Sequence, residues 1–232
     1  MSASHQRVER VRQCLRNVLE SLCPEDADLV FRRLNARFLS PASAFESGPE
    51  ILRETGLRPE QALLLSMIPE LAQRLEVEAF GKDPRLNTLR LAGDYLKTRF
   101  IGLRVEHFYL LCLDASGRLL SSILLQRGTT DSTPFYVRHI LQEAVRTHAS
   151  ALVISHNHPN NTLRPSEGDL RCTLDLLEAL RALSIPLMDH IIIVNKRVVS
   201  LRQCGFVPEN LWLAQSPQNA LLSGWLSDCE EF

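Results

Sequence analysis

The most constraining feature of this 232-residue chain is a change of hydrophobic periodicity near residues 81–85. Before that point apolar residues recur every three or four positions, a pattern that predicts amphipathic helices. After it, alternating apolar stretches are interleaved with helical ones, which predicts a mixed α/β (α+β) structure. Because the turn-rich segment GKDPR separates the two patterns, we expect a helical region over 1–82, a mixed domain over 83–207 and a C-terminal tail over 208–232.

A tight turn, Thr55-Gly56-Leu57-Arg58-Pro59, joins two of the helices expected in the first region. This segment resembles a helix-hairpin-helix unit, which binds the DNA backbone through amide groups exposed beside glycines. Arg58 stands where the second glycine belongs, and its side chain obstructs close approach to a phosphate. We therefore interpret the unit as a degenerate hairpin, in which helix packing is favoured over DNA contact. The expected helices cover residues 8–22, 27 to about 40, 49–54 and 60–75.

The second region alternates strand and helix patterns. Ala115-Ser116-Gly117 predicts a turn between two strands. Asp131-Ser132-Thr133-Pro134 predicts a helix start, because a hydroxyl cap precedes a proline in the first turn. The expected helices span 86–98, 131–148 and 166–183, and the expected strands span 105–114, 118–126, 150–155, 187–195 and 197–201.

Composition limits the partners of the chain. The formal net charge of −1 gives nucleic-acid binding no support. No run of about 18 apolar residues is present, and the N-terminus is polar, so we expect a cytoplasmic protein without a membrane span. Six scattered cysteines form no C-x-x-C pair and predict reduced thiols. Apolar residues of the tail either pack on the domain or dock on a partner: Leu211, Trp212, Leu213, Trp225 and Leu226.

Candidate metal ligands follow the apolar stretch Ala151–Ile154. His156 and His158 are two residues apart where the expected strand ends, so both imidazoles project to one side. Asp169 follows eleven residues later, in the first turn of the next helix. Three protein ligands leave one zinc position for water, which is typical of catalytic sites. Such a zinc ion lowers the pKa of that water and polarises a carbonyl group.

Each part of this pattern has a simpler interpretation. Two histidines at a strand end are common on surfaces, and Ser166-x-x-Asp169 is also a capping box. Their occurrence together, across one loop, favours a metal site. A hydrolase also needs a general base. Glu106 heads the apolar face of a strand, which suits either a base in a cleft or an ordinary glutamate at a sheet edge. Four residues are candidates for this role: Glu106, His139, Glu143 and Glu167.

The spacing His156-x-His158-x7-Ser166-x-x-Asp169 resembles the JAMM motif of the JAB/MPN metalloprotease superfamily. The stretches LRVEHFYLLCLDASGRLL, RGTTDSTP, ALVISHNHP and IPLMDHIIIVNKRVVSLRQCGF extend the resemblance to the RadC family, over roughly residues 86–207. The resemblance implies a curved mixed sheet flanked by helices, with zinc on the two histidines and the aspartate. It further implies Glu106 as base, Ser166 as the group that stabilises the oxyanion, and hydrolysis of an amide bond in a protein or peptide substrate.

The chain departs from the family pattern near the motif. Asn160-Asn161 replaces the usual Ser-Gly, although asparagine tolerates unusual backbone angles. His139 replaces the glutamate of a Pro-Arg-Glu sequence, and we interpret it as a solvated helix residue. Asp189 and His190 match an Asp-His pair of the family. They either support the metal ligands through hydrogen bonds or form a satisfied polar pair at a strand start.

Two other functions remain alternatives to the hydrolase. The helical region could be the reader of a DNA-associated protein, as the historical description of RadC proteins in DNA repair implies. The domain could also be a non-catalytic MPN scaffold, but such scaffolds usually lose metal ligands that this chain keeps. A zinc deaminase is disfavoured because H-x-E and P-C-x-x-C are absent. The absence of H-E-x-x-H excludes a helical zincin.

Overall fold

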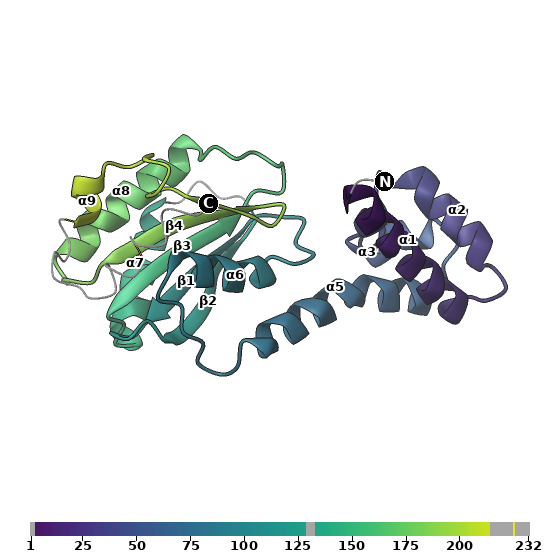
Figure 1. Ribbon diagram of the computed structural model, residues 1–232, viewed down its shortest axis with the longest axis horizontal. Helices are drawn as coiled ribbons and strands as arrows, with labels where there is room; N and C mark the ends of the chain where they lie inside the picture. Colours follow the sequence, from purple (N-terminus) through teal and green to yellow (C-terminus); the bar gives the residue numbers. More distant parts are fainter. Residues whose placement is uncertain (1–2, 129–132, 214–224, 226–232) are drawn as a thin grey trace. The chain divides into compact units, whose positions relative to one another are not determined.

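The chain divides into two compact structural units, residues 1–75 and 76–232. The computed structural model describes residues 3–128, 133–213 and 225 (Figure 1). The described part of the first unit is helical, and every described strand belongs to the second. The predicted fold class, a helical region followed by a mixed α/β sheet flanked by helices, is therefore confirmed. None of the described helices combines the length and apolar character needed to cross a bilayer.

The described residues of the first unit form five helices, and the last of them extends past residue 75. Apolar residues on their inner faces form one core, which includes Leu19, Leu34, Leu52 and Leu65. The 3.6-residue period of these positions explains why short helices suffice, because each buries one face against the others. The helices are α1 (Ala3–Leu22), α2 (Ala27–Arg37), α3 (Pro41–Phe45), α4 (Pro49–Arg53) and α5 (Pro59–Ala79).

The expected hairpin lies between α4 and α5. Gly56 has a φ of 104°, a left-handed conformation that glycine adopts without strain. The exposed Arg58 side chain lies 3.3 Å from Glu60, and the Arg58 amide donates a hydrogen bond to Gln61 Oε1 (2.9 Å). Since this amide already has a partner within the unit, the geometry favours helix packing over contact with a phosphate.

The second unit is built on a sheet in the order β2-β1-β3-β4-β5. β3 and β4 are parallel and are joined by helix α8 (Glu167–Arg181), whereas the other neighbouring pairs are antiparallel. A crossover helix is the usual connection between parallel strands. The strands are β1 (His107–Leu113), β2 (Leu119–Arg127), β3 (Ala151–Asn157), β4 (Leu187–Val194) and β5 (Arg197–Ser200).

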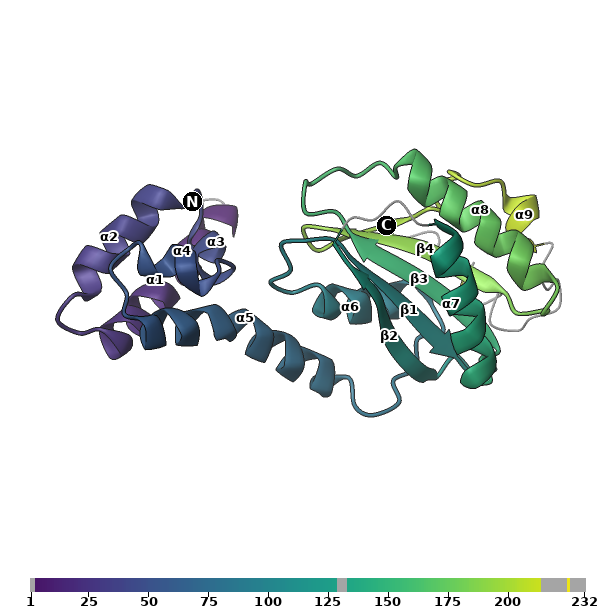
Figure 2. The same ribbon diagram turned by 180° about the vertical axis from the view of Figure 1, so that it is seen from behind.

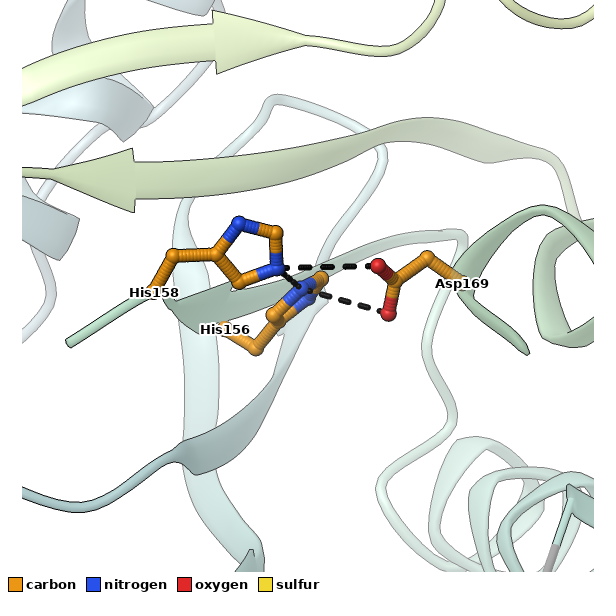
Figure 3. A group of neighbouring side chains, drawn as sticks. All are labelled: His156, His158 and Asp169. Atoms are coloured by element: carbon orange, nitrogen blue, oxygen red, sulfur yellow. Dashed lines mark hydrogen bonds and ion pairs between the residues drawn. The ribbon is translucent and has the colours of Figure 1, made fainter. Parts of the chain in front are cut away.

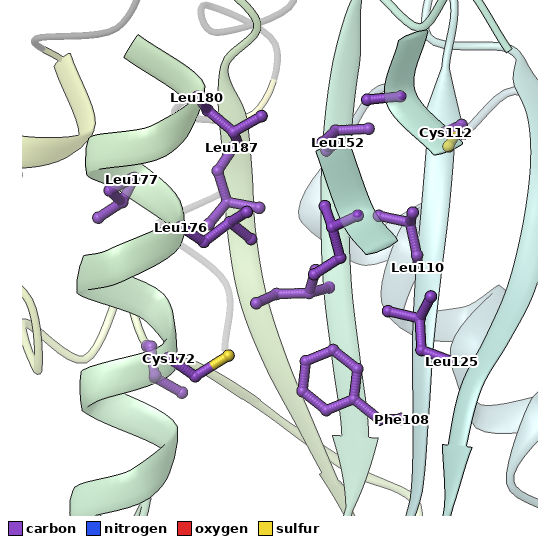
Figure 4. Packing of buried hydrophobic residues seen from close by; sticks show 14 of the residues in the cluster. Phe108, Leu110, Cys112, Leu125, Leu152, Cys172, Leu176, Leu177, Leu180 and Leu187 are labelled. Atoms are coloured by element: carbon purple, nitrogen blue, oxygen red, sulfur yellow. The ribbon is translucent and has the colours of Figure 1, made fainter. Parts of the chain in front are cut away.

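Helices cover both faces of this sheet, which explains why β1, β3 and β4 are buried along their whole length. Helices α7 (Thr133–Arg146) and α8 pack on one face (Figure 2). Figure 4 shows part of this core, which includes Leu176 of α8, Leu110 of β1 and Leu152 of β3. Helix α6 (Leu89–Arg99) packs on the other face. The predicted helix start at Asp131-Ser132 lies outside the described residues.

Two tryptophans of the tail pack on the domain. Trp212, in α9 (Glu209–Leu213), is buried in the α7–α8 core and donates its indole hydrogen to the Val207 carbonyl (3.2 Å). Trp225 is buried in the core beneath α6. For these two residues the structure therefore supports packing rather than docking on a partner, while Leu226 lies outside the described residues.

Candidate metal centre

Two histidines lie where strand β3 leaves the sheet. His156 is fully buried near the end of the strand, and His158 lies one residue beyond it with a tenth of its side chain exposed. Both imidazoles project to the same side (Figure 3), as expected for residues two apart on a strand. The Phe108 ring stacks parallel to that of His156, with 5.9 Å between ring centres. The neighbouring strand thus restricts the orientation of His156.

Asp169 comes from the first turn of α8 and completes the group (Figure 3). Its Oδ1 atom lies 3.3 Å from His156 Nε2, and its Oδ2 atom lies 3.6 Å from His158 Nε2. The two Nε2 atoms are 2.9 Å apart. The structure therefore brings the three ligands predicted from the sequence into one cluster. Within the described ranges it is the only cluster of three or more histidine, cysteine, aspartate or glutamate side chains placed to share a metal ion.

The partner of His158 decides which of its nitrogens carries the hydrogen. His158 Nδ1 lies 2.7 Å from the Thr162 carbonyl oxygen. A carbonyl oxygen only accepts hydrogen bonds, so Nδ1 is the donor. In the neutral ring, Nε2 therefore presents a lone pair to the cluster.

A longer chain of hydrogen bonds gives the same result for His156. Thr173 Oγ1 donates to the Asp169 carbonyl oxygen (2.7 Å) and so accepts from His190 Nδ1 (2.7 Å). His190 Nε2 then carries no hydrogen and accepts from His156 Nδ1 (2.9 Å). Burial holds the pKa of His190 well below its ordinary value, which keeps this ring neutral. The Nε2 atom of His156 is left with a lone pair that faces Asp169.

This arrangement of donors suits a metal cation. Two lone pairs and a carboxylate converge within a few ångströms, and a shared positive charge stabilises them. Burial alone would raise the pKa of Asp169, but hydrogen bonds from Ser166 and from the imidazoles of His156 and His158, when these are protonated, outweigh it and hold that pKa far below its usual range. The same carboxylate raises the pKa of His158, against the opposing effect of burial. Protons therefore compete with a metal here, and we expect metal binding to weaken as the pH falls.

Replacing Thr173 with valine should weaken the binding of a metal ion, tested with zinc, about 10- to 100-fold, the usual effect of removing a hydrogen-bond partner behind a metal ligand. Valine keeps the shape of threonine but cannot accept from His190, so His156 loses the chain that fixes its hydrogen. Competition with a chelator measures the zinc dissociation constant. Thr173→Ser retains the hydroxyl and should behave like the wild type. Equal affinities of the valine variant and the wild type would show that this chain does not orient His156.

A pocket of about 560 Å³ opens beside the cluster, and Glu106 lines it together with His158, Ser166 and Asp169. Glu106 immediately precedes β1. Because Phe108 of β1 pairs with His156 of β3, the start of β1 lies at the same end of the sheet as the histidines. The charge of Glu106 contributes to the raised pKa of His158, so this carboxylate lies within electrostatic reach of the cluster.

The other candidate bases lie elsewhere. His139 and Glu143 lie 3.9 Å apart on α7, and Glu143 also accepts hydrogen bonds from Arg146 (2.6 and 2.8 Å). Neither of them lines the pocket, and neither does Glu167 at the start of α8. Among the described residues, Glu106 is therefore the only pocket carboxylate besides Asp169.

Ser166 caps α8 with its side chain. Its Oγ atom accepts a hydrogen bond from the Asp169 amide (3.1 Å), and the Asp169 carboxylate accepts one from the Ser166 amide (2.7 Å), which is a capping box. The Ser166 hydroxyl also donates to Asp169 Oδ2 (2.7 Å). In this structure the hydroxyl hydrogen is thus directed at the carboxylate, and Ser166 must turn to donate to a substrate.

The loop between the histidines and α8 keeps an unusual backbone angle without glycine. Asn161 has a φ of 64°, in the left-handed region that asparagine tolerates better than most residues. Asn160 Oδ1 accepts a hydrogen bond from the Thr162 amide (3.1 Å), and Thr162 is the residue whose carbonyl binds His158. The asparagine pair therefore supports the loop that orients this ligand.

Asp189 and His190 lie on opposite faces of β4, as adjacent strand residues do. His190 contacts His156, whereas the Asp189 carboxylate accepts hydrogen bonds from the Ser200 hydroxyl, the Arg202 amide and the Trp225 indole (3.5 Å). Of this pair, the structure places only His190 beside the ligand cluster. Asp189 instead links β4 to Trp225 through a hydrogen bond from the indole.

Asp189 should make the stability of the fold depend on pH. Burial raises the pKa of Asp189 to about 6, despite the hydrogen bonds that it accepts. Because the unfolded value is about 3.9, the folded state binds this proton more tightly. The resulting stability is full below about pH 4 and is lost as the pH rises through 6, by an amount on the order of 3 kcal/mol. Asp189→Asn should therefore flatten the free energy of unfolding between about pH 4 and 7. Urea unfolding at several pH values makes the comparison, and parallel curves for the two proteins would contradict it.

A mixed sheet covered by helices on both faces, with a His-His-Asp cluster at the end of one strand, is the arrangement expected of a JAB/MPN domain. A family profile described as the RadC-like JAB domain matches residues 86–206. The chain belongs to this RadC-like JAB family, as its sequence motifs predict.

Several relatives in the comparison are bacterial. A UPF0758 protein from Bordetella petrii is 34% identical over 164 residues, which cover 70% of this chain and 73% of the relative. A UPF0758 protein from Azotobacter vinelandii is 34% identical over 155 residues, with 67% and 69% of the two chains covered. Another, from Thermosynechococcus vestitus, is 35% identical over 154 residues, with 66% and 62% covered. These names state no activity.

Proposed function

We propose that this protein is a zinc-dependent metallopeptidase or isopeptidase, which hydrolyses an amide bond in a protein or peptide. One observation carries the proposal: the hydrogen-bond partners of His156 and His158 direct both Nε2 lone pairs toward the Asp169 carboxylate, beside a pocket lined by Glu106. Membership in a family with a RadC-like JAB domain agrees with it.

The residues of the cluster and the pocket divide the chemistry among them. His156, His158 and Asp169 would hold the zinc, which supplies a Lewis acid for the carbonyl group and for water. Glu106 would take a proton from the attacking water and pass it to the departing amine. The Ser166 hydroxyl would turn from Asp169 and donate to the carbonyl oxygen as negative charge develops there.

Metal analysis and cleavage profiling of the full chain test this proposal. After incubation with zinc and gel filtration, we expect about one zinc ion per chain, as a single three-ligand site predicts. Peptide and isopeptide libraries should be cleaved, a chelator should stop the cleavage, and added zinc should restore it. A chain that retains no stoichiometric zinc would exclude the proposed mechanism.

A further inference from the structure

An apolar groove of about 580 Å³ lies between α1 and α5 in the first unit. Val18 and Leu22 of α1 line it, together with Leu64, Met67 and Leu71 of α5. These three α5 side chains are 54%, 49% and 59% exposed. A contiguous exposed apolar surface of this kind usually marks a binding site for another protein surface.

Five of the exposed residues of α5 form a stripe with a charge at each end. Glu60, Leu64, Met67, Leu71 and Arg74 are spaced alternately by four and three residues, so they lie along one side of the helix. Glu60 and Arg74 are each seven residues from Met67, in opposite directions. Both charged side chains are mostly exposed. The stripe is therefore apolar in the middle, acidic at its N-terminal end and basic at its C-terminal end.

We propose that this α5 stripe binds a second copy of itself in an antiparallel orientation, with a two-fold axis at Met67. Seven residues span about 10.5 Å of helix, so the axis places Glu60 of each copy opposite Arg74 of the other. Leu64 of one copy, three residues before the axis, then lies within one residue (about 1.5 Å) of the level of Leu71 of the other, four residues after it. The Glu60–Arg74 and Leu64–Leu71 pairs each occur twice, as a two-fold interface requires of pairs away from its axis.

The charges select this partner and this orientation. A parallel pair would place Glu60 against Glu60 and Arg74 against Arg74, whereas the antiparallel pair forms two attractive contacts. Among the described residues of one chain, the ion-pair partners of these groups are local and exposed: Arg58 lies 3.3 Å from Glu60, and Glu70 lies 2.9 Å from Arg74. Such surface pairs are weak, so their exchange costs little. The groove, whose lining includes Leu64, Met67 and Leu71 of the stripe, gives the apolar side chains of the second copy a place to bind.

Analytical ultracentrifugation of the full chain tests the association. We expect a monomer–dimer equilibrium that shifts toward dimer as the protein concentration rises. Leu71→Glu should weaken the dimer about a hundredfold, because it places two carboxylates in the apolar middle of the interface. Leu29→Glu is the matched control: Leu29 is 42% exposed on α2 and does not line the groove, so the dimer should persist. Circular dichroism checks that both variants remain helical. A monomer at every concentration, or a dimer that Leu71→Glu leaves intact, would overturn the proposal.

Charge reversal tests the orientation. Glu60→Arg and Arg74→Glu should each weaken the dimer about three- to tenfold, because each creates two repulsive pairs. The double variant re-forms both attractive pairs with reversed signs and should restore the wild-type dissociation constant. Additive weakening in the double variant would rule out the antiparallel register. None of these substitutions touches the metal cluster, so the result is independent of the proposed hydrolase activity.

Discussion

Glu106→Gln is expected to lower the rate of amide cleavage at least about 100-fold while zinc content stays at the wild-type level. Glutamine keeps the size of the side chain and its place in the pocket but cannot accept the proton of water. General-base catalysis contributes about 10²- to 10⁴-fold to enzymatic rates. The measurements are kcat and KM on a substrate found by cleavage profiling, together with zinc per chain. We expect the loss in kcat, because proton transfer belongs to the chemical step.

Glu167→Gln is the matched control for this experiment. Glu167 is a nearby carboxylate at the start of α8, but it does not line the pocket, so its removal should leave the rate unchanged. An unchanged rate in Glu106→Gln would remove Glu106 as the base. Loss of zinc from Glu106→Gln would instead mean that this carboxylate supports the metal.

Asp169→Ala is expected to reduce zinc affinity more than 100-fold, beyond the effect of Thr173→Val, because it removes a ligand rather than a partner of a ligand. Cleavage should fall to background with the zinc. The same change also removes the carboxylate of the capping box, so the metal-free protein should lose about 1 kcal/mol of stability. Metal titration and urea unfolding of the metal-free protein measure the two effects separately.

Ser166→Ala separates the cap from the ligand. It removes the side-chain acceptor of the capping box and should cost a similar free energy of unfolding, yet it leaves all three zinc ligands in place. We therefore expect the Ser166→Ala variant to bind zinc like the wild type, and the Asp169→Ala variant to lose tight zinc binding. Stoichiometric, tight zinc binding by Asp169→Ala would show that Asp169 only caps helix α8 and is not a metal ligand.

Periodicity predicts most of the fold because nearly every element buries one or both faces. Helices α1, α2, α5, α6 and α8 lie within a few residues of their expected ranges. Helix α3 is not predicted: its cap at Ser40 and its first-turn Pro41 are visible in the sequence, but five residues are too few to show a period.

Strand β1 begins two residues later than the sequence predicts, and a distant residue explains the difference. The Asn157 side chain accepts a hydrogen bond from the His107 amide (2.8 Å) and donates one to the Val105 carbonyl (3.2 Å). It thus replaces the strand partner that these backbone groups would otherwise have. Since Asn157 is fifty residues from His107 in the sequence, no local pattern near Val105 could indicate that β1 begins only at His107.

The three metal ligands could be predicted because their spacing is itself the signal, but the residues that orient them have no such pattern. Thr173 is one helical turn after Asp169, which is a visible relation. Its second partner, His190, belongs to another strand, so their contact appears only in the fold. Adjacent residues of a strand project from opposite faces of the sheet. The sequence alone therefore indicates that Asp189 and His190 do not share a face.

The proposed metal ligands and the hydrogen-bond partners that orient them belong to one continuous β3–α8–β4 crossover, whereas Glu106 directly precedes β1. In the proposed mechanism, metal binding and proton transfer therefore depend on residues from separate stretches of the chain. A single substitution at Glu106 can therefore remove the proton acceptor of such a protein and leave every residue of the proposed metal site in place. For a protein with this fold, metal binding by the His-His-Asp cluster is therefore weaker evidence of hydrolytic activity than the presence of the glutamate.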